Sequence, residues 1–319
     1  MPSSTRLSVT VLASALAGWL IPGQALSPSA QTQAATSPFP IIGITAAERE
    51  ILSHQEIVYL DDGQGGLSKT LRIAGINVQV VDGSGATPGT PTGLGNLIVG
   101  YNELRGGGDD RTGSHNLVVG RNHNYTVYGG LVAGDHNSIS AEWASISAGE
   151  NNLASGRASA VSGGTGNTAS GAHSTVSGGG SNIASNYSSA VSGGYNNLAS
   201  GQYSSVSGGA AGLAGANSAS VSGGVVNQAL GDGSSVSGGY GNSASSYGTT
   251  ISGGRDNSVT SYFASISGGL HNTAAGFGAT VGGGRYNTSA GDYSSVSGGN
   301  SRSAPNIDDW RAGTSFEDN

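Results

Sequence analysis

One stretch of fifteen residues decides the fold, because close copies of it return along the chain at a constant spacing. It reads Val161-Ser162-Gly163-Gly164-Thr165-Gly166-Asn167-Thr168-Ala169-Ser170-Gly171-Ala172-His173-Ser174-Thr175. We number its positions from one to fifteen, starting at the aliphatic residue. The opening aliphatic residue is expected at Leu131, Ile146, Val161, Val176, Val191, Val206, Val221, Val236, Ile251, Ile266, Val281 and Val296. A fixed short period is typical of a solenoid, whose stability comes from stacking similar coils. The sequence therefore predicts an all-β chain, a parallel β-solenoid of 15-residue coils.

The residue types within one coil predict which side chains face inward. Side chains alternate along a strand, so positions fourteen, one and three should share the inner face, and positions fifteen and two the outer face. Position one then forms a core ladder, and glycines at positions three, four and eleven allow the bends. The expected core ladder contains Val161, Val176, Val191, Val206, Val221, Val236, Ile251, Ile266, Val281 and Val296.

Position seven is usually asparagine, and position nine is usually small. Side-chain amides stacked coil upon coil can donate to the next copy, so we expect an asparagine ladder on a second strand. Its members are Asn152, Asn167, Asn182, Asn197, Asn227, Asn242, Asn257, Asn272 and Asn287.

Composition narrows the classes of function. The chain has 319 residues, of which 58 are glycine and only 10% are charged, with a net charge of −7. No basic patch is apparent, so nucleic acid is not an expected partner. Cysteine is absent, which excludes disulfides and thiolate metal sites.

The chain divides into six segments. Residues 1–25 are predicted to be a signal peptide, because Arg6 precedes a short apolar run that Pro22 ends; the alternative is an uncleaved membrane anchor. No transmembrane span is expected after cleavage. A linker, 26–44, precedes an N-terminal α+β capping block, 45–92. In that block Thr45 and Glu48 have capping-box spacing, and strands are expected at 56–60, 69–73 and 76–81. Irregular first coils with an insertion, 93–130, precede the regular coils, 131–300, and a C-terminal cap or tail that breaks register, 301–319.

The run from Asn167 to Gly179, Asn-Thr-Ala-Ser-Gly-Ala-His-Ser-Thr-Val-Ser-Gly-Gly, resembles the head repeats of YadA-like trimeric autotransporter adhesins of bacteria. The likeness covers about residues 95–300. It implies a left-handed parallel β-roll and a homotrimer in which three chains pack side by side. The period of fifteen departs from the fourteen usual in those heads, and the stalk and membrane anchor of that family are not recognised here.

Aromatic residues gather at positions twelve and thirteen, where they would line one edge of the solenoid. Such a ridge could stack on sugars or contact a protein; the alternative is that the rings only pack the bend or are ordinary exposed residues. The candidate binding ridge is Trp143, Tyr187, Tyr203, Tyr247, Tyr262, Phe277 and Tyr293.

Other candidate sites are weaker. The acidic turns at Asp61-Asp62 and Asp109-Asp110 could hold calcium or be solvated turns. The histidines have no metal-ligand spacing, and neither a catalytic constellation nor a cofactor motif is recognised. Hydroxyl columns at positions fifteen and two resemble ice-binding faces, although serine predominates over threonine.

These features predict an exported, non-enzymatic, adhesin-like or structural surface module, secreted or held at the cell surface. Its expected partners are a host-matrix protein or a glycan, bound by multivalent contacts. The alternatives are an ice-binding solenoid and a phage-fibre-like carbohydrate-binding module.

Overall fold

The computed structural model describes residues 45–312. The expected signal peptide, 1–25, the expected linker, 26–44, and the last residues of the expected tail, 313–319, lie outside this range. The described chain forms two units, divided between Val78 and Gln79. The expected capping block, 45–92, is therefore split, because its residues from Gln79 onward belong to the unit that contains the coils.

The first unit is a helix followed by a hairpin. Helix α1 (Ala46–Ser53) starts with the expected capping box between Thr45 and Glu48. Strands β1 (Gln55–Asp61) and β2 (Leu67–Ile73) pair antiparallel. The third strand expected at 76–81 is wrong: the chain turns at Gly75 (φ 77°), and no strand follows before residue 97. Whether this unit caps the coils stays a prediction.

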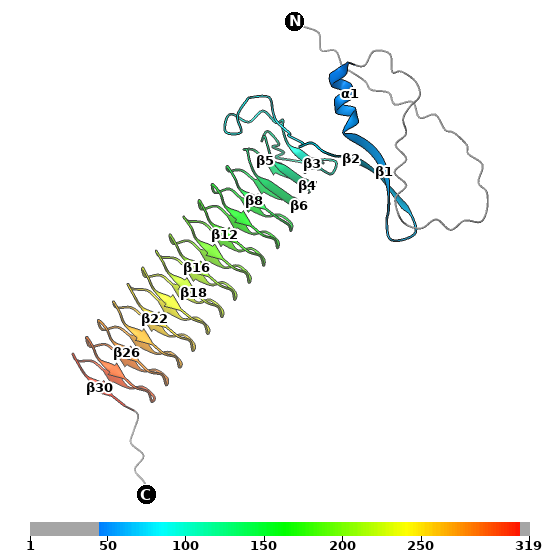
Figure 1. Cartoon of the computed structure of the whole chain (residues 1–319). Helices are drawn as coiled ribbons and strands as arrows, with labels where there is room; N and C mark the ends of the chain where they lie inside the picture. The colour runs from blue at the N-terminus through cyan, green and yellow to red at the C-terminus, as the bar shows by residue number, and fades with distance from the viewer. Residues whose placement is uncertain (1–44, 313–319) are drawn as a thin grey trace. The chain divides into compact units, whose positions relative to one another are not determined.

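The second unit is a parallel β-solenoid, which confirms the predicted fold class. Two sheets run along it, of 15 and 13 strands (Figure 1). The coils from β4 to β29 contribute one strand to each sheet, whereas β3 and β30, at the two ends, belong to the first sheet alone. The first sheet contains β3 (Leu97–Val99), β4 (Leu117–Arg121), β6 (Leu131–Asp135), β8 (Ser145–Ile146), β10 (Ala160–Val161), β12 (Thr175–Val176), β14 (Ala190–Val191), β16 (Ser205–Val206), β18 (Ser220–Val221), β20 (Ser235–Val236), β22 (Thr250–Ile251), β24 (Ser265–Ile266), β26 (Thr280–Val281), β28 (Ser295–Val296) and β30 (Trp310–Arg311). The second contains β5 (Asn124–Tyr125), β7 (Ser138–Ile139), β9 (Leu153–Ala154), β11 (Thr168–Ala169), β13 (Ile183–Ala184), β15 (Leu198–Ala199), β17 (Leu213–Ala214), β19 (Gln228–Ala229), β21 (Ser243–Ala244), β23 (Ser258–Val259), β25 (Thr273–Ala274), β27 (Thr288–Ser289) and β29 (Ser303–Ala304).

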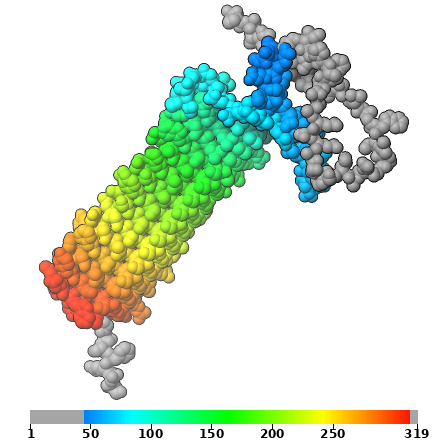
Figure 2. All heavy atoms as spheres, viewed as in Figure 1, coloured from blue at the N-terminus to red at the C-terminus, as the bar shows by residue number. Residues whose placement is uncertain are grey.

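Backbone hydrogen bonds connect each coil to the next at both sheets. The N–H of Thr175 donates to the carbonyl of Ser189 at 3.0 Å, and the N–H of Ile183 donates to the carbonyl of Asn197 at 2.8 Å. Fifteen strands in one sheet, at a strand spacing of about 4.8 Å, make this unit roughly 67 Å long. The space-filling view shows the coils stacked without gaps along this unit (Figure 2).

The core is a narrow column of small and aliphatic side chains. Every member of the expected core ladder is at most 1% exposed, and the alanines at position nine are fully buried. Position three does not face inward as expected: a Cβ built on Gly178 or Gly193 would contact nothing within 4 Å. Because one strand ends before this position, the alternation of side chains stops there.

A one-residue insertion explains where that strand ends. β4 pairs with β6 over five residues at a spacing of fourteen, from Leu117–Leu131 to Arg121–Asp135. β6 then pairs with β8 at the same spacing, but the isolated bridge from Asp135 to Glu150 spans fifteen. The extra residue therefore lies within 147–149 and acts as a bulge that leaves a two-residue strand and a separate bridge. Later coils keep this arrangement.

Because of this insertion, the prediction that Leu131 is the first aliphatic residue of the core column is wrong. Val132, which is fully buried, pairs with Ile146 in the core column, whereas Leu131 pairs with Ser145 outside it. A slip of one residue moves a side chain to the opposite face of a strand, so two adjacent aliphatic residues made the register ambiguous.

The expected break in register at Ser301 is also wrong. β29 pairs with β27, and β30 pairs with β28, so that Arg311 lies opposite Val296 at the usual spacing. Arg302 stands at the asparagine position and Arg311 at the aliphatic position, which hid this last coil from the sequence pattern.

Candidate functional site

The buried asparagines connect neighbouring coils at the bend between the two sheets. Asn182 donates through Nδ2 to the carbonyls of Gly178 in its own coil (2.9 Å) and Gly194 in the next coil (3.0 Å). Its Oδ1 accepts from the backbone N–H of Asn197 at 3.0 Å. All nine asparagines of the expected ladder are at most 1% exposed. The asparagine side chains therefore connect the backbone of one coil to the backbone of the next, which is a structural role.

We expected each asparagine side chain to donate to the next asparagine side chain of the ladder, but few of them do. Such a bond joins Asn242 to Asn227 at 3.2 Å and Asn257 to Asn242 at 3.1 Å. The column also begins earlier than expected, with Asn137 and, before it, His123, whose Nδ1 accepts from the N–H of Asn137.

The aromatic ridge lies at the bend opposite the asparagines in each coil. Position thirteen has a left-handed backbone, for example at Tyr203 (φ 58°), Phe263 (φ 57°) and Tyr293 (φ 56°). Its N–H donates to the carbonyl of position twelve one coil earlier, as from Tyr203 to Tyr187 at 3.0 Å. This bond fixes the two positions beside each other, so their side chains meet across coils.

Ring contacts form two separate runs along the ridge. In the first, Tyr187 contacts His173 and Tyr203 edge-to-face at centroid distances of 5.5 and 5.6 Å. The second is longer and joins five rings in four consecutive coils at 5.4 to 6.4 Å. Its members are Tyr247, Tyr262, Phe263, Phe277 and Tyr293. Phe263, which also stands at position thirteen, connects Tyr247 to Phe277.

The rings of the second run contact one another and are also exposed to solvent. Tyr262, Phe263 and Tyr293 are 56%, 55% and 61% exposed. Trp143 lies apart from both runs, packed edge-to-face on Tyr128 and under the guanidinium of Arg157 at 4.4 Å. The structure therefore brings part of the predicted ridge together, mainly over residues 247–293.

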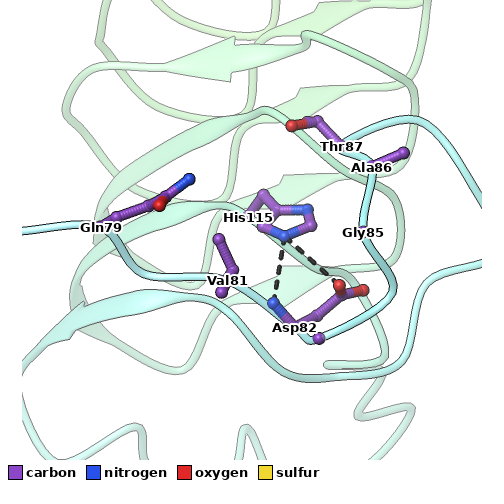
Figure 3. Close-up of a pocket in the computed structure, with 8 residues that line it drawn as sticks. Gln79, Val81, Asp82, Gly85, Ala86, Thr87 and His115 are labelled. Atoms are coloured by element: carbon purple, nitrogen blue, oxygen red, sulfur yellow. Dashed lines mark hydrogen bonds and ion pairs between the residues drawn. The ribbon is translucent and has the colours of Figure 1, made fainter.

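A small pocket lies beside the first coils, between the segment 79–87 and His115 (Figure 3). Its volume is about 350 Å³, and polar groups of Gln79, Asp82 and Thr87 line it. Nε2 of His115 lies 3.2 Å from the backbone N of Asp82 and 3.6 Å from its Oδ1, whereas Nδ1 of His115 is buried without a hydrogen-bond partner (Figure 3). Hydrogen bonds from Ser84 lower the pKa of Asp82. No sequence pattern predicted this pocket, because it forms only where the segment 79–87 lies against His115 in the folded chain.

The acidic turns use their carboxylates locally. Oδ1 of Asp62 accepts from the N–H groups of Gln64 and Gly66, both at 2.8 Å, and Asp110 caps Thr112 in the same manner. Within residues 45–312, no group of three or more His, Asp or Glu side chains is placed to hold a metal ion. Neither acidic turn therefore gathers three such side chains around a possible calcium position.

No family model matches the chain, and no curated protein sequence matches it. No helix among the described residues is long and apolar enough to cross a membrane.

Proposed function

We propose that the protein is exported and non-enzymatic, and that the aromatic ridge of its solenoid makes multivalent contacts with a glycan or a matrix protein. The observation that carries the proposal is the run of five contacting, largely exposed rings over residues 247–293. Tyrosine and phenylalanine faces stack on sugar rings and are common at protein interfaces. Rings fixed at strand spacing present several weak contacts at once, and several such contacts bind by avidity.

A matched set of variants tests the ridge. Tyr262→Ala and Tyr293→Ala remove two exposed rings of the second run, and Tyr195→Ala removes an equally exposed tyrosine (64%) at the other bend. In an array of neutral glycans and matrix proteins, we expect a ligand whose binding weakens about tenfold in the double ridge variant but not in the control. Equal binding by all variants, or no ligand at all, would contradict the proposal.

A thermal-hysteresis measurement on the purified protein distinguishes this function from the ice-binding alternative. In the first sheet, position fifteen carries threonine at only three places, Thr175, Thr250 and Thr280. We therefore expect no thermal hysteresis from the purified protein, whereas a measurable hysteresis would favour the ice-binding solenoid over the ridge.

We also propose that three copies of the chain associate along the second sheet, as the resemblance to trimeric adhesin heads implies. The support is an aliphatic column on its outer side, in which Ile183, Leu198 and Leu213 are adjacent in three successive coils. After a first spacing of twenty residues, the next two, Val118 to Val132 and Val132 to Ile146, are fourteen residues, the period usual in those heads.

Sedimentation equilibrium tests the association. We expect the mass of a trimer for the unmodified chain and a smaller mass for Leu198→Ser/Leu213→Ser. Thr273→Ser, in the same column, is the control and should leave the mass unchanged. A monomeric unmodified chain would contradict the proposed trimer without bearing on the ridge.

A further inference from the structure

The bend that holds the asparagines carries a second cluster, outside the ridge. At position five, Tyr240, Arg255, Leu270 and Arg285 follow one another through isolated bridges in consecutive coils. At position six, beside them, stand Asp256, His271 and Tyr286. We call Tyr240, Arg255, His271, Arg285 and Tyr286 the basic corner. The ridge occupies positions twelve and thirteen, at the other bend of the coil.

In the basic corner, an arginine and a histidine each pack against a tyrosine ring. The guanidinium of Arg255 lies 5.2 Å from the centroid of the Tyr240 ring, and the His271 ring stacks on Tyr286 at 5.2 Å with an interplanar angle of 10°. Both tyrosines are about half exposed. The backbone beneath is fixed by bonds between coils, such as the N–H of Tyr286 to the carbonyl of Leu270 at 2.9 Å. The groups are therefore held in a constant arrangement.

The charge of this corner is opposite to that of the chain. The chain has a net charge of −7, and only three arginines and no lysine lie between Ile146 and Ser301. Two of these arginines are in the basic corner. Asp256 is the one acidic side chain beside them, with an oxygen 3.1 Å from Nε of Arg255 and 3.7 Å from Nε2 of His271. Arg285 is exposed and forms no ion pair with any described residue. An anion can therefore reach its guanidinium.

The spacing of the cations is set by the fold. Arg255 and Arg285 lie two coils apart, at about 9.6 Å along the axis. One sugar unit of an extended polysaccharide is about as long as the rise of one coil, so alternate units would meet successive guanidinium groups. Guanidinium groups bind carboxylate and sulfate oxygens through paired N–H donors, and tyrosine faces accept sugar rings.

We propose that the basic corner binds an acidic polysaccharide, whose sugars carry carboxylate or sulfate groups, laid along the coil axis. The anions contact Arg255 and Arg285, and the sugar rings lie against Tyr240 and Tyr286. This site is independent of the proposed ridge, since the two lie at different bends and differ in charge.

Immobilised dextran sulfate, polygalacturonate and neutral dextran test the proposal on the full chain at low and high salt. We expect at least one acidic polymer to bind about tenfold more tightly than dextran, with affinity that falls as salt rises. The two acidic polymers distinguish sulfate from carboxylate as the preferred anion, and either preference supports the proposal.

Charge variants locate the binding. Arg255→Gln/Arg285→Gln should weaken binding to the acidic polymer about tenfold or more, and Asp256→Asn should strengthen it. Arg157→Gln, which removes one positive charge at the other bend, and Tyr262→Ala on the ridge should each change it less than about twofold. Circular dichroism of each variant checks that the coils are intact.

Two results would overturn the proposal. One is equal binding of dextran and both acidic polymers by the unmodified chain. The other is retention of acidic-polymer binding by Arg255→Gln/Arg285→Gln with unchanged circular dichroism. The ridge is tested separately, by the binding of its own ligands to Tyr262→Ala/Tyr293→Ala. The experiments can therefore refute one proposed site without refuting the other.

Discussion

Removing a single asparagine amide from the middle of the solenoid should have a large effect on stability. Asn182→Ala deletes the two bonds to Gly178 and Gly194 and the acceptor for the buried N–H of Asn197. A net value of about 1 kcal/mol for each bond, together with the cost of an unpaired buried N–H, gives a loss of about 3 to 4 kcal/mol. Ser192→Ala, at an exposed position of the same region, is the control and should change stability by less than about 0.5 kcal/mol.

The chain offers the reverse change at Gly212, which occupies position seven without a side chain. Gly212 donates its N–H to Oδ1 of Asn197 at 2.8 Å but offers no acceptor to Asn227. A Cβ there would lie 3.1 Å from that Oδ1 and 3.3 Å from Val206, a tight fit that other coils accommodate with asparagine. Gly212→Asn should therefore stabilise the protein by about 1 to 2 kcal/mol.

Urea unfolding followed by circular dichroism measures both changes, with the slope checked for constancy. Hydrogen exchange adds a local readout: the N–H of Asn227 should exchange faster than that of Asn242 and should slow in Gly212→Asn. The reasoning fails if Asn182→Ala matches Ser192→Ala, or if Gly212→Asn lowers the urea midpoint.

Three further predictions concern single positions, each measured as a shift of the urea midpoint. Val226 is β-branched with a left-handed backbone (φ 50°), so Val226→Asn should stabilise by about 1 kcal/mol, and a loss would contradict the strain argument. Buried Oγ of Ser174 has no partner, whereas Oγ of Ser204 donates to Gly201 at 2.7 Å; Ser174→Ala should raise the midpoint, Ser204→Ala should lower it, and equal shifts would refute the distinction. Burial lowers the pKa of His123 from 6.5, so the folded state binds fewer protons, and stability present above about pH 6.5 falls as the pH drops below it. His123→Asn should flatten this acid dependence, and an unchanged pH profile would rule out His123 as its source.

The sequence predicted the coil because its constraints repeat. An aliphatic residue, an asparagine and small residues return in the same order, and each occupies the same buried place in the structure. The prediction was wrong at Leu131, where Leu131 and Val132 are both aliphatic and only the paired strands distinguish inside from outside. It was wrong again in the last coil, because Arg311, an exposed polar residue, stands opposite Val296 where earlier coils have an aliphatic residue.

The candidate site was predicted less completely, for a different physical reason. Aromatic residues at positions twelve and thirteen could be seen to share a bend, but their contacts depend on the offset between coils, as Phe263 demonstrates. The basic corner was missed because positions five and six change residue type from coil to coil. Its pattern, such as His271 on Tyr286, appears only when neighbouring coils are superposed.

The bonds between coils have a consequence for how such a protein can change over generations. From Ile146 to Val296, neighbouring coils are joined at the same fifteen-residue register throughout. If one complete period of fifteen residues were removed or duplicated, the coils on either side of the change could form the same backbone hydrogen bonds that neighbouring coils form now. An in-frame deletion or duplication of whole repeats in the gene would therefore change the length of the solenoid without changing its fold. Selection could then act on length separately from the other properties of the protein.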